Sequence, residues 1–180
     1  MKPDNVLKFW FAKNMGPEQW FFGKRKGMDS LIRKKFFKTY WSVVRGETAS
    51  WRKTPRGRLA EIIVLDQFSR NLFRGTPQMY QCDPLALMLA QEAVARGADK
   101  KLNKYERLFM YLPFEHSESK IIQKESMRLI RKLGLKWAVP YFIDHKRIID
   151  RFGRFPHRNA ILGRKSTPAE KKFMLTHKGY

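Results

Sequence analysis

The chain has 180 residues, of which 43% are hydrophobic and 14% aromatic, and this composition excludes fibrous and disordered proteins. Its 38 lysine and arginine residues against 16 acidic residues give a formal net charge of +22. Such a charge favours contact with a polyanion, either nucleic acid or an acidic membrane surface, but it is also compatible with a basic composition that carries no function. The longest strongly apolar stretch without a charge, residues 137–143, is far below the roughly 20 residues of a membrane-spanning helix, so we expect no membrane span.

The single cysteine, Cys82, cannot form an internal disulfide and is typical of a reducing compartment. The first residues do not resemble a secretory signal, because Lys8 and Trp10 interrupt the apolar stretch and no small-residue cleavage site follows. We therefore expect a cytoplasmic protein. No Ser- or Gly-rich linker divides the chain, so we expect residues 1–180 to form a single all-helical domain.

Apolar residues recur at three- and four-residue steps along nearly the whole chain, which is the period of an α-helix and not of a strand. This pattern predicts helices over residues 3–12, 28–45, 55–72, 83–96, 102–111, 119–133, 136–151 and 167–175. About eight helices with short connections predict an all-α stack of antiparallel helix pairs. Residues 152–165 contain Gly153, Pro156 and Gly163 and predict an ordered loop.

Several predicted helices begin at a capping side chain followed by proline, whose missing N–H costs nothing in the first turn. These starts are Thr54-Pro55, Thr76-Pro77, Asp83-Pro84 and Thr167-Pro168, and Glu170 completes a capping box at the last of them. Helix ends are predicted at glycines that can take the left-handed conformation, namely Gly46, Gly97 and Gly134.

The first segment with candidate chemistry is LDQFSRNLFRG, residues 65–75, where polar groups interrupt an apolar helix. Asp66 and Arg70 are four residues apart, so they share a helix face and can pair. Two interpretations stay open for Asp66. It is either half of a buried structural ion pair or a catalytic or binding carboxylate.

The second segment is LPFEHSE, residues 112–118, where Pro113 is predicted to break a helix. Adjacent residues on a helix do not face each other, so His116 and Ser117 do not form a nucleophile and its base. Neither a Cys cluster nor His-Glu-x-x-His spacing is present, so we expect no metal. The simplest role of His116 and Glu118 is to cap helix ends.

The third segment, residues 145–164, begins with His145 on an apolar helix face, where a histidine is usually a hydrogen-bonded core residue. After it, arginines alternate with phenylalanines: Arg151, Phe152, Arg154, Phe155, Arg158 and Arg164. Arginine forks bind carboxylate or phosphate with two parallel hydrogen bonds. The same arginines could instead satisfy helix-end carbonyls and pair with Asp66, Glu118 or Asp150, and both interpretations stay open.

A basic region spans residues 24–58, with twelve basic residues against Asp29 and Glu47. A charge-rich helix face is ordinarily solvated, but a basic patch also binds phosphates with little sequence preference. The candidate nucleic-acid surface within it is Arg33, Lys34, Lys35 and Lys38.

The chain resembles the bacterial family labelled domain of unknown function 924. The resemblance rests on residues 7–11, Trp20-Phe21 and the motifs LDQFSRNLFRGT, LPFEHSE and RFGRFPHRN at residues 65–76, 112–118 and 151–159. It covers essentially the whole chain. It implies a tetratricopeptide-like superhelical domain and no activity, and fold alone would supply none.

From these segments we expect a soluble helical scaffold with one polar pocket on its concave side, because buried polar groups need partners. Its ligand is expected to be anionic, and no cofactor is expected. The alternatives are an enzyme with His/Asp acid–base chemistry on a phosphate- or carboxylate-bearing molecule, and a scaffold for an acidic peptide. The candidate catalytic residues are His116, His145, Asp66 and Glu118. The candidate ligand-binding residues are Arg70, Arg74, Arg154, His157, Arg158 and Asn159.

Overall fold

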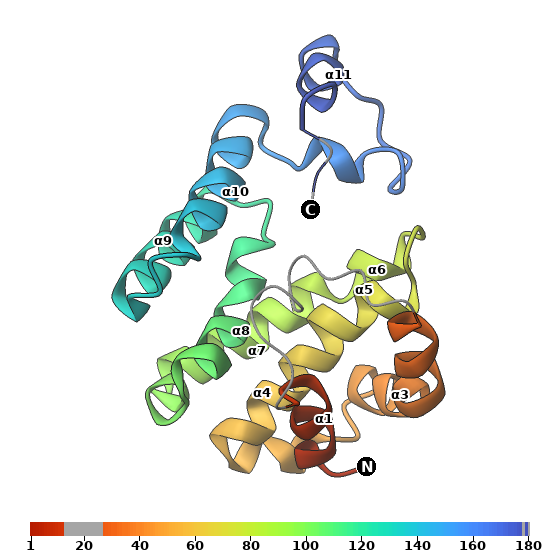
Figure 1. Cartoon of the computed structure of the whole chain (residues 1–180), viewed down its shortest axis with the longest axis vertical. Coiled ribbons are helices and arrows are strands. Elements are labelled where there is room, and N and C mark those ends of the chain that lie inside the picture. The colour runs from red at the N-terminus through yellow and green to blue at the C-terminus, as the bar shows by residue number, and fades with distance from the viewer. Residues whose placement is uncertain (13–26, 178, 180) are drawn as a thin grey trace.

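A computed structural model of the chain describes residues 1–12, 27–177 and 179. All regular structure within these residues is helical, which confirms the predicted all-α class (Figure 1). The α-helices are α1 (Pro3–Trp10), α3 (Met28–Val44), α4 (Pro55–Ile63), α5 (Ser69–Leu72), α6 (Gln78–Gln81), α7 (Asp83–Ala95), α8 (Lys104–Glu115), α9 (Lys120–Leu133), α10 (Val139–Phe152) and α11 (Pro168–Met174). Shorter turns are η1 (Ala49–Lys53), η2 (Val64–Phe68), η3 (Ala98–Lys101) and η4 (Pro156–Arg158).

Two of the predicted proline starts are confirmed by their hydrogen bonds. Thr54 Oγ1 accepts from the Gly57 amide at the start of α4. Thr167 and Glu170 form the predicted capping box at the start of α11. The predicted start at Thr76 is wrong, because its hydroxyl donates to the Phe73 carbonyl, 2.8 Å away, and α6 begins only at Gln78. Asp83 also fails to cap, as described below.

Pro113 lies inside α8, so the prediction that it breaks a helix is wrong. An internal proline removes one backbone hydrogen bond and crowds the preceding turn, at a cost of about 3 kcal/mol. In α8 this cost is opposed by burial, since Leu112 and Phe114 on either side of Pro113 are both 2% exposed. Tertiary packing therefore overrides the local preference, and the helix extends four residues beyond its predicted end.

The predicted helix over residues 55–72 forms as one continuous run, α4–η2–α5, but its middle turn is a π-helix. In a π-helical turn the backbone hydrogen bond spans five residues and not four, so the turn accommodates one extra residue. Such turns occur often at functional sites. Asp66 lies in the middle of this turn. The run passes through the centre of the molecule, because α4 packs against α1, α7 and α8.

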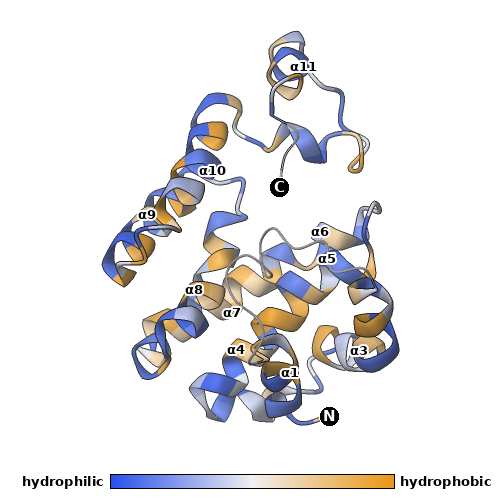
Figure 2. Cartoon of the chain, in the orientation of Figure 1, coloured by the Kyte–Doolittle hydropathy of each residue, from blue (hydrophilic) through white to orange (hydrophobic). Residues whose placement is uncertain are grey.

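The main core is built from the apolar faces of these helices, with buried side chains from Val6 to Phe142 (Figure 2). Helices α8, α9 and α10 pack on one another in chain order (Figure 1). A helical stack is thus present, whereas the comparison with tetratricopeptide repeats stays a prediction.

The predicted loop after α10 is largely confirmed, with one short helical turn, η4, inside it. Gly153 ends α10 with a φ of 70°, a conformation that glycine adopts without strain. A second apolar cluster of Ile148, Ile149 and Phe155 holds the loop against α10, with Phe152 and Phe173 at its edge. This packing places η4 where its residue Arg158 contacts Tyr80 and Asp83.

Candidate functional site

Asp66 and His116 are in direct contact although they lie 50 residues apart in the chain. His116 Nδ1 is 2.7 Å from Asp66 Oδ1, while Gln67 Nε2 donates to Asp66 Oδ2 at 2.6 Å. Arg70 Nη1 lies 3.3 Å from Asp66 Oδ1, so the predicted pair on one helix face forms. The Asp66 side chain is 1% exposed and the His116 side chain 14%, which places the imidazole on the accessible side of the carboxylate.

The surroundings of this pair determine which group carries the charge. Burial opposes ionisation of Asp66, but Arg70 and His116 outweigh it and hold the pKa of Asp66 below its usual range. Burial lowers the pKa of His116, an effect that the neighbouring Asp66 charge opposes. At neutral pH the pair is therefore a carboxylate and a neutral imidazole. Nδ1–H of that imidazole donates to Asp66, which leaves Nε2 of His116 as an acceptor.

Arg70 extends the contacts from Asp66 to Asp83. Its Nη1 and Nη2 donate to the two carboxylate oxygens of Asp83 at 2.9 and 3.0 Å, in the fork geometry that arginine favours. The prediction that Asp83 caps α7 is wrong, because Asp83 is already the first helical residue and Cys82 occupies the N-cap position. The Asp83 carboxylate instead forms ion pairs with two guanidinium groups, those of Arg70 and Arg158. Arg158 is 75 residues away from Asp83 in the chain.

Arg158 is the most buried of the arginines with an ion pair here, with 6% of the residue exposed. Its guanidinium carbon lies 4.5 Å from the ring centre of Tyr80 and 4.4 Å from that of Phe155. Nη1 donates to Asp83 Oδ2 at 3.2 Å, whereas Nε is buried and has no hydrogen-bond partner among the described residues. Burial lowers the pKa of Arg158, with Asp83 opposing the shift.

His145 connects this arginine to His116 through aromatic contacts. The His145 and Phe155 rings meet edge to face with centres 5.5 Å apart, and the His145 and His116 ring centres are 6.2 Å apart. His145 Nδ1 lies 2.9 Å from the Tyr141 carbonyl oxygen and 3.2 Å from Glu115 Oε1. Burial raises the pKa of Glu115 well above its usual value and lowers the pKa of His145 well below its usual value. Both shifts favour the uncharged form of the side chain.

These contacts close on themselves, and we call the resulting set of eight residues the side-chain ring. Its members come from η2, α5, α6, α7, α8, α10 and the η4 loop, so the three sequence segments meet here. The ring consists of Asp66, Arg70, Tyr80, Asp83, His116, His145, Phe155 and Arg158.

Four candidate residues are bound elsewhere rather than in the ring. Arg74 forms an exposed pair with Asp29 outside the ring, and its expected role in ligand binding stays a prediction. Arg154 pairs with Glu170, and Asn159 bonds Ser166 and Arg164. Glu118 accepts from the Phe155 amide and pairs with Arg164, so it anchors the loop and does not cap a helix end.

The remaining candidate, His157, lies beside Phe155, with ring centres 5.5 Å apart and ring planes tilted by 36°. Burial lowers the pKa of His157 to about 4. The expected capping role of the His116 side chain is also wrong, because its ring bonds Asp66 while its backbone ends α8.

Sequence reasoning missed Tyr80 and the role of Asp83 as an ion-pair partner, and it included Glu115 only as a member of the LPFEHSE segment. Asp83 carried the pattern of a helix cap, and that local signal concealed its partners 13 and 75 residues away. Tyr80 stands in ordinary amphipathic surroundings, where a sequence gives no signal for a contact made after folding.

The four candidate nucleic-acid residues, Arg33, Lys34, Lys35 and Lys38, are all exposed on α3. Arg33 donates to the Leu72 carbonyl and lies over the Phe37 ring, and Lys35 lies over the Phe9 ring. Two predictions fall outside the described residues: the first basic residues of the region, 24–26, and the Trp20-Phe21 motif.

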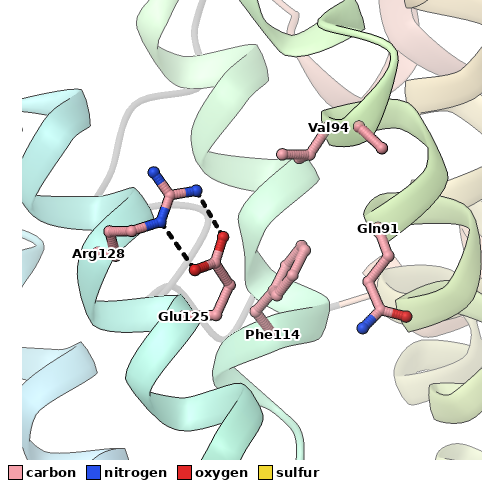
Figure 3. Close-up of a pocket in the computed structure, with 6 residues that line it drawn as sticks. Gln91, Val94, Phe114, Glu125 and Arg128 are labelled. Carbon is pink, nitrogen blue, oxygen red and sulfur yellow. Dashed lines mark hydrogen bonds and ion pairs between the residues drawn. The ribbon is translucent and has the colours of Figure 1, made fainter.

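A separate cavity of about 420 Å³ opens between α7, α8 and α9 (Figure 3). Its lining is mainly apolar, from Val94, Ala95 and Phe114, and it contains the Arg128–Glu125 pair, whose charges neutralise each other. None of the ring residues lines it.

Among residues 1–12, 27–177 and 179, no group of three or more His, Cys, Asp or Glu side chains is arranged to hold a metal ion. In the same part of the chain, no helix is long and apolar enough to cross a membrane.

Comparisons with known proteins add a fold relationship without an activity. The model of a family described as "Bacterial protein of unknown function (DUF924)" matches residues 6–178. The solved structure of a protein of unknown function, ATU0120 from Agrobacterium tumefaciens, shares 38% sequence identity with the chain. The match covers 96% of each chain, with a TM-score of 0.88. No curated protein matches the chain.

Proposed function

The chain belongs to the DUF924 family of bacterial proteins of unknown function, and because that family prescribes no ligand, we propose from the geometry of the side-chain ring that it binds a small anionic molecule there. The observation that carries this proposal is the buried Nε of Arg158, which has no hydrogen-bond partner within the part of the chain that the structure describes. A buried donor without a partner costs about 1–3 kcal/mol, so it is rarely retained without a reason.

Two features of the ring support an anion as the missing partner. Arg158 is desolvated by the Tyr80 and Phe155 rings, and a desolvated guanidinium gains more from a counter-ion than a solvated one. Its one ion-pair partner among the described residues, Asp83, is already shared with Arg70. Arg158 therefore has no carboxylate of its own among the described residues, although the two arginines and two carboxylates of the ring balance overall.

Isothermal titration of the full chain with sodium acetate and sodium phosphate tests the proposal. We expect saturable binding of at least one anion, with an affinity that falls at least tenfold in Arg158→Gln. Arg151→Gln is the matched control, because Arg151 also lies over two rings, those of Phe152 and Phe173, but is exposed. Binding of neither anion, or equal binding by Arg158→Gln, contradicts the proposal.

A second candidate function, acid–base catalysis on the bound molecule, is favoured by the Asp66–His116 pair. A buried carboxylate that orients a partly exposed, neutral imidazole is the arrangement of a general base, with Nε2 as the proton acceptor. A proton next to a carboxylate or phosphate group of the ligand is the natural target.

Deuterium exchange tests this candidate. The protein is incubated in D₂O with small carboxylates and phosphates, and loss of carbon-bound protons is followed by proton NMR. We expect catalysed exchange that His116→Gln abolishes while anion binding persists. Exchange that is unaffected by His116→Gln excludes His116 as the base.

We further propose that the exposed basic face of α3 contacts nucleic acid, a role supported by the net charge of +22. A scaffold that takes an acidic peptide in its expected groove stays the other alternative, and titration of the full chain with poly-glutamate tests it. The unbridged Cys82 supports a cytoplasmic location. The contacts that join η4 to α6 and α7 support a single domain over residues 1–180.

A further inference from the structure

The donors that Arg158 leaves unused have a defined direction. A guanidinium presents its hydrogens in its own plane, and Nε–H and one Nη2–H point the same way, forming a pair of parallel donors. Asp83 engages Nη1. Nε is buried without a partner among the described residues. The edge of the guanidinium formed by Nε and Nη2 is therefore where a ligand would supply the missing hydrogen-bond acceptor.

Two aromatic rings pack against this guanidinium. The ring centres of Tyr80 and Phe155 lie 4.5 and 4.4 Å from its central carbon. A carboxylate is planar and meets two parallel donors with both of its oxygens in that plane. A phosphate would place further charged oxygens out of that plane, beside the ring faces of Tyr80 and Phe155, which supply no hydrogen-bond donor, so desolvation is costly.

The charge of the side-chain ring sets a second condition. Arg70 and Arg158 are balanced by Asp66 and Asp83, and burial lowers the pKa values of His116 and His145 so that neither contributes a positive charge at neutral pH. The ring is therefore neutral as a whole. Glu118, which also acts on Arg158, is paired with Arg164 and leaves this balance unchanged. A monoanion meets less repulsion from these carboxylates than a dianion does.

From the planar edge and the neutral ring together, we propose that the ligand of this site is a monocarboxylate, bound side-on by Nε and Nη2 of Arg158, and not a phosphate. This inference rests on the anion-binding function proposed above and names the chemical class of its ligand.

The test compares acetate, benzoate and inorganic phosphate by isothermal titration of the full chain at pH 7.5. We expect both carboxylates to bind at least tenfold more tightly than phosphate. Tighter binding of phosphate overturns this inference and leaves the anion site in place. If none of the three binds, the anion site itself is wrong as well.

Two variants separate side-on binding from simple charge attraction. Arg158→Lys keeps the charge and loses the parallel donors, so we expect it to lose carboxylate affinity at least tenfold, whereas Arg151→Lys binds as the wild type does. Asp83→Asn removes one negative charge beside Arg158, so we expect phosphate affinity to rise relative to acetate. Circular dichroism establishes that each variant is folded. Unchanged carboxylate affinity in folded Arg158→Lys overturns the side-on geometry.

Discussion

Gly57 lies so close to Trp51 that a β-carbon on Gly57 would be 1.9 Å from the Trp51 carbonyl oxygen and 2.7 Å from its carbonyl carbon. Both neighbours are backbone atoms, which cannot rotate away as a side chain can. The contact holds η1 against the first turn of α4, where the Gly57 amide also donates to the Thr54 cap. Glycine is required here for space and not for its backbone freedom.

Gly57→Ala is therefore expected to destabilise the protein by about 3 kcal/mol, although alanine normally favours a helix. Gly134→Ala is the matched control. Gly134 has a positive φ of 74° but open space around its α-carbon, so only the strain of about 1 kcal/mol applies. Urea unfolding of both variants measures the difference. A Gly57→Ala protein as stable as the wild type would show that η1 moves freely from α4.

Asp66→Asn is expected to cost about 3 kcal/mol of unfolding free energy, because it leaves Arg70 and His116 buried beside an uncharged amide. Asp29→Asn removes a carboxylate from the exposed pair with Arg74 and should change stability by about 0.5 kcal/mol or less. Thermal unfolding of the two variants checks this. Unchanged or higher stability in Asp66→Asn would contradict a structural ion pair and favour a functional reason for the carboxylate.

The pH dependence of stability should reveal the buried histidines. The pKa of His157 is lowered from 6.5 to about 4 in the folded protein, so the unfolded chain binds a proton first as the pH falls. The stability that this shift contributes is fully present above pH 6.5 and is lost as the pH falls through that window towards 4. The same direction holds for His116 and His145, whereas Glu115, with its raised pKa, acts in the opposite sense.

His157→Gln should flatten the dependence of unfolding free energy on pH between 6.5 and 4. Thr176→Ala, an exposed change that removes no titrating group, should leave the slope as in the wild type. Urea titrations at half-unit pH intervals supply both curves. Parallel curves for wild type and His157→Gln would mean that His157 titrates as it does in the unfolded chain.

If the basic face of α3 binds nucleic acid, RNA affinity should fall steeply between about 50 and 200 mM salt, because each neutralised phosphate releases a counter-ion. Changing Arg33, Lys34, Lys35 and Lys38 together to glutamate should weaken binding at least tenfold for every sequence. Changing the exposed Lys100, Lys101, Lys104 and Lys132 alters the net charge equally and should weaken it less. Fluorescence anisotropy measures both. No binding by the wild type at the lower salt, or equal losses in the two variants, would contradict this surface.

Local sequence signals predicted the helices well, because periodicity and capping act over a few residues. The starts of α4 and α11 follow directly from Thr54-Pro55 and from the Thr167 capping box. The same local logic failed at Pro113, where burial between neighbouring helices outweighs one lost hydrogen bond.

The candidate site was harder to predict, because ion pairs are chosen among all charges that folding brings near. Asp66 and His116 were singled out by their unusual surroundings in the sequence, and the structure brings them together. Arg74 stands in the same sequence segment as Asp66, yet it forms an ion pair with Asp29 on α3 at the surface. No spacing rule relates Asp83 to Arg158, so their pairing was visible only in three dimensions.

The π-helical turn at Val64–Phe68 carries a consequence for how this site tolerates changes in chain length. One surplus residue in a helix turns everything after it by about 100° relative to everything before it. Deleting a single residue from this turn would restore an ordinary helix that still buries an apolar stripe, while Arg70 would rotate away from Asp83. We therefore expect chains with a one-residue insertion or deletion in this turn to fold but to lose the function of the site. No point substitution nearby is expected to divide the two properties as sharply.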